Sequence, residues 1–121
     1  MRPLPNFPVD YWDGRCAITG LAVPEFLRAS RIKPWATCDS GAERLEVFNG
    51  LLLVGHLDAL FDHGFITVMD NGAVVASPML DADARTTMGV AGPMSAIAIA
   101  DGHRRYLPWR RDRVFRAVLP N

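Results

Sequence analysis

Hydrophobic and polar residues alternate along residues 27–32, which predicts a half-buried strand. A second apolar stretch, residues 45–53, is interrupted by Asn49-Gly50, a pair that favours a turn between apolar runs. In residues 55–61, apolar side chains recur at i, i+3 and i+4, a spacing typical of a short amphipathic helix. The central stretch, residues 27–62, is therefore predicted to run strand, loop, strand and helix.

The clearest local signal elsewhere is Asp70-Asn71-Gly72, which lies between two apolar runs and predicts a β-hairpin with a tight turn over residues 65–77. Asp81 is suited to cap a helix that runs to about Met88, and a last helix is predicted to run from Arg105 or Leu107 to Val118. Residues 15–19 favour a short strand, whereas residues 90–100 carry no clear pattern. These elements together predict an α+β fold.

Proline-rich residues 1–14 predict an extended N-terminal arm, which Tyr11 and Trp12 would pin to a domain formed by residues 15–121. The length of 121 residues suits a single domain, and a hydrophobic content of 50% is enough for a core. No apolar run is long enough for a membrane helix, and the N-terminus lacks a signal-peptide core, so a cytoplasmic location is expected. The isolated Cys16 and Cys38 argue against a structural zinc site and are expected to be reduced thiols.

Five segments resemble a known family when they are taken in order along the chain: CAITGL, LRASRIKPW, ERLEVFNGLLL, LDALFDHGFITV and HRRYLPWRRDRVFR. They are similar to the HNH endonuclease domains found at the C-terminal end of bacterial restriction enzymes. The resemblance covers about residues 16–116. It implies a ββα-metal core, in which a β-hairpin and a helix hold one divalent cation, with an added hairpin and a C-terminal helix. It also implies hydrolysis of DNA phosphodiester bonds with Mg²⁺ or Mn²⁺.

The resemblance assigns roles to four residues of the central stretch. Arg31 stands where the family carries the general-base histidine of a Ser-His-Ile run. Asn49 matches the asparagine that holds the histidine loop in place, and Asp58 matches a metal ligand on the helix. His56 is a weaker candidate for the same metal.

Arg31 changes the expected chemistry. A guanidinium stays protonated in proteins, so it does not activate water as a base, although it binds phosphate through two parallel hydrogen bonds. Weak cutting with retained phosphate binding is therefore predicted. Two alternatives remain open: the metal ion lowers the pKa of its own water, or His56 or His63 acts as the base.

Charge is balanced overall, with 13 Lys and Arg against 13 Asp and Glu, but arginines gather near the C-terminus. One interpretation is a track for the DNA backbone, with Lys33, Arg110 and Arg111 as the predicted contacts. The other is a solvated helix that pairs with acidic residues. Trp35 is expected to pack under the loop and His103 to lie on the surface.

The leading functional hypothesis is an HNH-type DNA endonuclease domain that Arg31 weakens. The alternative is a catalytically inactive HNH fold that binds DNA or another protein. No base-reading element is visible in the sequence, so any target preference is expected to come from another domain or from a partner. The expected partners are DNA and either a second copy in a homodimer or a target-recognition domain on a longer chain.

Overall fold

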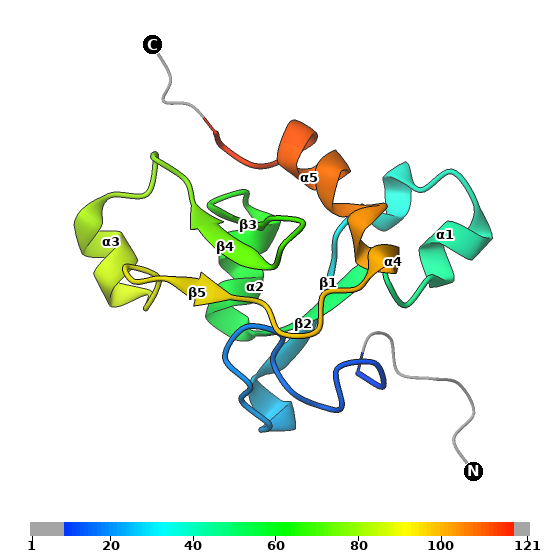
Figure 1. Cartoon of the computed structure of the whole chain (residues 1–121), viewed down its shortest axis with the longest axis horizontal. Coiled ribbons are helices and arrows are strands. Elements are labelled where there is room, and N and C mark those ends of the chain that lie inside the picture. Colours follow the sequence, from blue (N-terminus) through cyan, green and yellow to red (C-terminus); the bar gives the residue numbers. More distant parts are fainter. Residues whose placement is uncertain (1–8, 118–121) are drawn as a thin grey trace.

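The computed structural model describes residues 9–117, and a hairpin with one helix forms its centre (Figure 1). Strand β1 (Leu27–Arg31) pairs antiparallel with β2 (Gly50–Val54), and helix α2 (Gly55–Asp62) follows β2 directly. Leu57, Leu60 and Phe61 of α2 are buried, as their spacing predicts. This is the predicted ββα arrangement, and the α+β class is confirmed.

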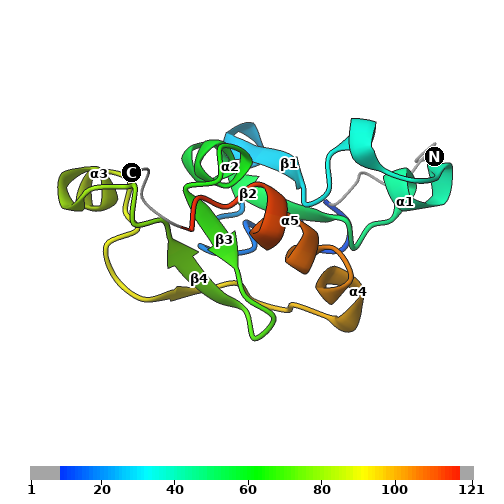
Figure 2. The ribbon, with the colours of Figure 1, turned by 90° about the horizontal axis from the view of Figure 1, so that it is seen from above.

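A second sheet packs against the other side of α2. Strands β3 (Ile66–Val68) and β4 (Ala73–Ala76) form the predicted hairpin, and β5 (Met94–Ser95) adds a third strand beside β4. Helix α2 contacts β1, β2 and β3, so it lies between the two sheets (Figure 2). The buried side chains of β2, α2 and β3 form one continuous core.

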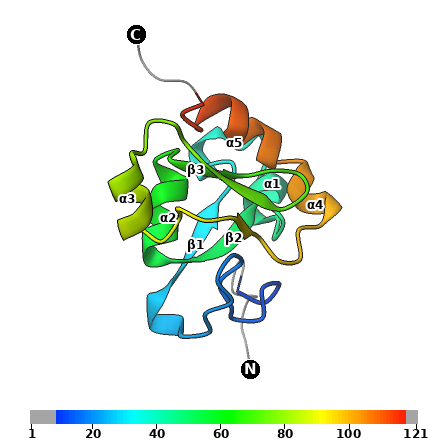
Figure 3. The same ribbon diagram turned by 60° about the vertical axis from the view of Figure 1, so that its left-hand side comes forward.

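Smaller elements surround this core, and they are 3₁₀ turns η1 (Pro24–Phe26) and η2 (Trp35–Thr37) and helices α1 (Gly41–Leu45), α3 (Ala82–Thr87), α4 (Asp101–Arg104) and α5 (Leu107–Arg113). Helices α1 and α3 lie at opposite ends of the molecule (Figures 1 and 2), and α5 lies beside β3 (Figure 3). The N-cap of α3 is Asp81, as predicted. Within residues 9–117, no helix is both long and apolar enough to cross a bilayer.

Three local predictions were wrong. Residues 15–19 form turns, because Gly20, at φ +77°, folds the chain back and leaves Ala17 with one bond to β2. Part of the loop before β2 is helix α1, which Ser40 caps by accepting the Glu43 amide. The predicted last helix begins at Leu107, one of its two expected starts, but it ends at Arg113 instead of Val118, and a separate short helix, α4, precedes it.

Residues 9–14, the described part of the predicted extended arm, form turns instead, in which the Gly14 N–H donates to the Val9 carbonyl at 3.0 Å. Tyr11 and Trp12 nevertheless pin this segment to the domain, as predicted. The Trp12 side chain is buried and its indole N–H donates to the Gly50 carbonyl over 3.4 Å. The Tyr11 hydroxyl donates to the Ala98 carbonyl over 2.5 Å. Residues 1–8 of the predicted arm lie outside the described residues.

Candidate functional site

The end of β1 faces α2 through Ser30 and Asp58. The buried Ser30 hydroxyl donates to Asp58 Oδ1, so the carboxylate of this half-buried residue is held toward the strand. Asp58 lies in the first turn of α2, where a negative charge suits the helix dipole. The sequence alone points to Asp58 but not to Ser30, because the alternation of β1 puts Ser30 on the same face as the exposed Arg28.

Arg31 is the last residue of β1 and pairs with Gly50 of β2. Successive side chains of a strand leave opposite faces, so Arg31 and Ser30 diverge. The Arg31 guanidinium donates to the Arg44 carbonyl in α1 and lies 5.1 Å from the centre of the Trp35 ring. Arg31 therefore contacts η2 and α1, the elements that follow β1 in the chain.

Asn49 joins the two ends of the loop between β1 and β2. Its fully buried amide accepts the Lys33 N–H over 2.7 Å and donates to the Lys33 carbonyl over 3.0 Å. The same nitrogen contacts the Cys38 sulfur at 3.5 Å and the Glu43 carbonyl at 3.4 Å. Asn49 thereby orders the loop that follows Arg31, which is the positioning task that the resemblance implies for it.

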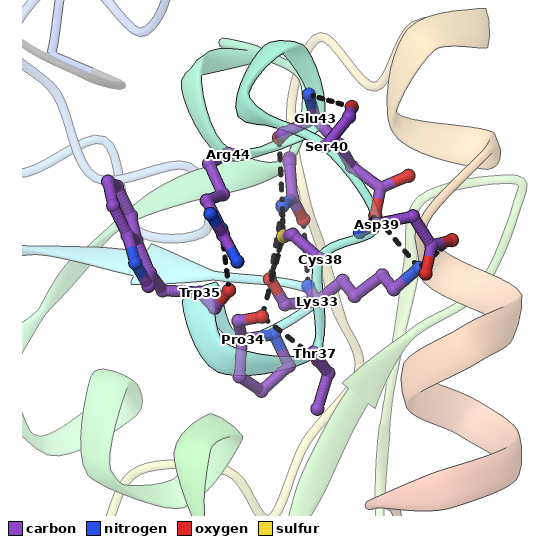
Figure 4. Close-up of polar contacts among 10 residues, drawn as sticks. Lys33, Pro34, Trp35, Thr37, Cys38, Asp39, Ser40, Glu43 and Arg44 are labelled. Atoms are coloured by element: carbon purple, nitrogen blue, oxygen red, sulfur yellow. Dashed lines mark hydrogen bonds and ion pairs between the residues drawn. The ribbon is translucent and has the colours of Figure 1, made fainter.

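Ion pairs fix the same loop from its outer side (Figure 4). Lys33 Nζ lies 2.8 Å from Glu43 and 3.2 Å from Asp39. The hydrogen bond to Glu43 raises the pKa of Lys33, and the same bond lowers the pKa of Glu43. Lys33 was predicted to contact DNA, but here its charge is neutralised within the loop.

His56 lies on a different face of α2 from the carboxylates of Asp58 and Asp62, which affects its suitability as a metal ligand. His56 precedes Asp58 by two residues, so the two side chains leave different faces of α2, and His56 is exposed. His56 and Asp58 are therefore not placed to bind one metal ion together. Asp62, four residues after Asp58, lies on the same face of α2 as Asp58. Among the described residues, no three His, Cys, Asp or Glu side chains form a group able to hold a metal ion.

Arg110 does not have the surface position that DNA contact requires. Its side chain is 1% exposed and packs 4.7 Å from the Phe61 ring centre. The guanidinium donates to the carbonyls of Ile32 at 2.6 Å, Phe61 at 2.9 Å, Arg31 at 3.2 Å and Asp62 at 3.4 Å. Arg110 thus ties α5 to the end of β1 and to the C-terminus of α2.

Burial and nearby carboxylates act on the pKa of Arg110 in opposite directions. Burial lowers the pKa of the guanidinium, while the carboxylates of Asp62 and Asp58 act in the opposite direction. The positive charge is therefore kept inside the fold by carbonyl dipoles on one side and by the acidic face of α2 on the other. This brings a fixed cation close to Asp58.

Other C-terminal arginines also bind the protein itself. Arg111 donates to the Val68 carbonyl at 3.1 Å and pairs with Asp70 at 2.8 Å. Arg104 donates to the Asp70 carbonyl at 2.9 Å, and Arg116 to the His63 carbonyl at 2.9 Å. The C-terminal arginines attach α4 and α5 to the neighbouring elements, an arrangement nearer to the predicted internal pairing than to a DNA track.

The two cysteines are free buried thiols, as predicted. Cys38 contributes to the loop through its contact with Asn49. Trp35 and His103 lie where sequence analysis did not expect them. The Trp35 side chain is 52% exposed, and His103 is fully buried beside Tyr11, Trp12 and Phe48.

Comparison with known families finds one match, which coincides with this site. Residues 16–69, from the turn before β1 to the end of β3, match the model of the HNH endonuclease family. Members of that family generally use a divalent metal ion. None of the curated proteins compared with the chain matches it. The match therefore supports an HNH domain in residues 16–69, the segment that contains the strand–strand–helix core.

Proposed function

We propose that this chain is an HNH-type DNA nuclease domain whose cutting is weakened because Arg31 stands at the general-base position. The observation that carries the proposal is the meeting of β1 and α2. Ser30 there contacts Asp58, and Arg31 follows Ser30 directly. The family match over the same residues supports a phosphodiester as the substrate.

Asp58 is the residue proposed to hold the metal ion. A single half-buried carboxylate suits Mg²⁺ or Mn²⁺, because Mg²⁺ keeps several of its waters and needs few protein ligands. The lack of a three-ligand group within residues 9–117 disfavours a tightly held ion such as Zn²⁺. When bound, the ion would neutralise charge on the phosphate and on the leaving oxygen.

Arg31 is proposed to bind phosphate rather than to activate water. A guanidinium does not accept a proton near neutral pH, so water attack lacks the base that histidine would supply. Asn49 keeps the loop after Arg31 in one conformation, which gives the guanidinium a defined position. Substrate binding is therefore expected to be retained, while the hydrolytic step is slow.

Plasmid nicking in Mg²⁺ and in Mn²⁺ tests this proposal. Arg31→His is expected to nick faster than the chain as given by at least roughly 100-fold, the lower range for general-base catalysis. Adding Asp58→Ala to Arg31→His is expected to abolish the gain. Asp83→Ala, which removes an exposed first-turn aspartate of α3, is the matched control and is expected to leave the gain intact.

Two results would contradict the proposal. If the chain as given already nicks as fast as Arg31→His, the base lies elsewhere, with His56, His63 or a metal-bound water as the alternatives. If no variant nicks but DNA still binds, the domain is a binding module built on an HNH fold.

Metal binding has a separate test in thermal unfolding. An ion that binds only the folded state raises the unfolding temperature as its concentration rises. Mg²⁺ and Mn²⁺ are expected to stabilise the chain as given and the Asp83→Ala control, but not Asp58→Ala. An equal shift in all three proteins would place the ion elsewhere.

A further inference from the structure

Trp35, Arg31 and Arg44 form an arginine–tryptophan cluster beside the candidate site, in which Trp35 is exposed and both arginines are half-buried. The Arg31 guanidinium carbon lies 5.1 Å from the Trp35 ring centre, and that of Arg44 lies 5.4 Å from it. Both distances are within the range of cation–π contacts. Half of the Trp35 side chain nevertheless remains accessible to solvent, at 52%.

From this arrangement we infer that the arginine–tryptophan cluster is a binding site for unpaired DNA, with a base stacked on Trp35 and a phosphate held by the arginines. The inference rests on the proposed function for the choice of DNA as the ligand. Indole and guanidinium planes are the surfaces on which single-stranded bases stack in proteins. In a duplex, each base is already stacked between its neighbours, so its faces are not available to Trp35.

The cluster is held rigid, which makes it suited to binding. Arg44 donates from Nε to the Trp35 carbonyl at 3.1 Å, and Arg31 donates to the Arg44 carbonyl. The Asn49 amide and the ion pair between Lys33 and Glu43 also order this loop. A ligand would therefore meet side chains that are already ordered, at little further cost in entropy.

Local charge favours a polyanion at this position. The nearby acids Asp39 and Glu43 pair with Lys33, so they do not pair with Arg44. Among residues 9–117, Arg44 has no carboxylate partner. The cluster shares Arg31 with the candidate site.

The test is fluorescence anisotropy in EDTA with a labelled oligothymidylate, an abasic oligonucleotide of equal length, and a duplex. The oligothymidylate is expected to bind most tightly. Trp35→Ala is expected to weaken its binding roughly tenfold, the scale of one base–aromatic stack, without affecting the abasic strand. Arg44→Ala is expected to weaken binding of both single strands.

Two variants serve as controls. Arg28→Ala removes an exposed arginine from the same strand as Arg31 and is expected to leave binding within about twofold, a change below the energy of one stacked base. Trp35→Phe keeps an aromatic face and is expected to retain most of the binding. It also removes the exposed indole, so quenching of tryptophan fluorescence by oligothymidylate is expected to disappear.

Equal affinity of Trp35→Ala and the chain as given for oligothymidylate would overturn the inference. Tighter binding of the duplex, or no binding of oligothymidylate, would also overturn it. Because EDTA prevents metal-dependent cutting, this outcome is independent of the nicking assay. If Arg31→His nicks no faster than the chain as given, while the chain as given still binds oligothymidylate through Trp35, only the catalytic proposal is overturned.

Discussion

Arg31 and Arg110 meet at the same point of the chain from opposite sides. Arg110 is buried and donates to the backbone carbonyls of Arg31 and Ile32 from within the fold. The Arg31 side chain contacts Trp35 and α1 at the rim. Arg110 therefore stabilises the backbone that carries the Arg31 side chain.

This comparison shows how little residue type says about role. Both guanidiniums donate to carbonyls and lie near an aromatic ring. Burial distinguishes Arg110 from Arg31, because the N–H groups of a buried guanidinium donate to carbonyls that water cannot reach. Arg110 is therefore a structural residue, whereas the half-buried Arg31 is the residue proposed to bind phosphate.

Removal of the Arg110 guanidinium gives the largest expected effect. Arg110→Ala leaves four carbonyls without their donor and opens space beside Phe61, so unfolding free energy is expected to fall by about 3–5 kcal/mol. Urea unfolding measures the loss. Arg111→Ala, the neighbouring partly exposed arginine, is expected to cost about 1 kcal/mol or less. Similar losses of unfolding free energy in both variants would contradict a structural role that is specific to the buried Arg110.

His103 extends the comparison to pH. Burial, with a further contribution from Arg104, lowers the pKa of His103 to about 4. The unfolded chain takes up this proton near pH 6.5, so between about 6.5 and 4 the unfolded state binds more protons. Stability is expected to be full above pH 6.5 and to fall by about 3 kcal/mol as pH drops through this window.

His103→Gln is the variant that checks the source of this pH dependence. Glutamine keeps an acceptor for the Ala100 N–H, which His103 Nδ1 accepts at 2.9 Å, but it does not titrate. Unfolding free energies at pH 4.5 and 7.5 are expected to lie closer together in this variant. An unchanged difference would assign the pH dependence to other groups.

Asn49 is expected to have an intermediate effect. Asn49→Ala removes the bonds to Lys33 and Glu43 and is expected to cost about 2 kcal/mol. Hydrogen exchange of the Lys33 amide, which donates to Asn49 Oδ1, is expected to accelerate. Asn71→Ala, in the exposed hairpin turn, is the matched control and is expected to leave Lys33 exchange unchanged. Unchanged exchange in Asn49→Ala would show that the loop is ordered without Asn49.

Trp35 is expected to have the smallest effect on stability. Because its side chain is half exposed, Trp35→Ala is expected to cost about 1 kcal/mol or less, although the residue is large. Trp12→Ala, which empties a buried position, is expected to cost about 3–5 kcal/mol. Thermal unfolding of both variants measures the difference. A large loss in Trp35→Ala would mean that Trp35 is a packing residue after all.

Local patterns predicted the elements that depend on neighbours in the sequence. The alternation of residues 27–32, the spacing of Leu57, Leu60 and Phe61, and the Asp70-Asn71-Gly72 turn each produced the expected element. Helix α1 was missed, although Ser40 and Glu43 have the spacing of a helix start. That signal was present and local.

Environments set by distant contacts were not predictable in the same way. Arg110 is buried by residues about 50 to 80 positions away in sequence, and no local pattern encodes those carbonyls. Trp35 stays exposed because α1 and Arg31 meet its ring without covering it. His103 is enclosed by Tyr11 and Phe48, which come from remote segments.

The most direct test of the central claim, that Arg31 occupies the general-base position, is the pH dependence of plasmid nicking by Arg31→His. If the new histidine is the base, the rate is expected to exceed that of the chain as given. It is also expected to rise with pH through a pKa near 6.5, where imidazole loses its proton. A rate no higher than that of the chain as given, or one without this rise, would contradict the claim.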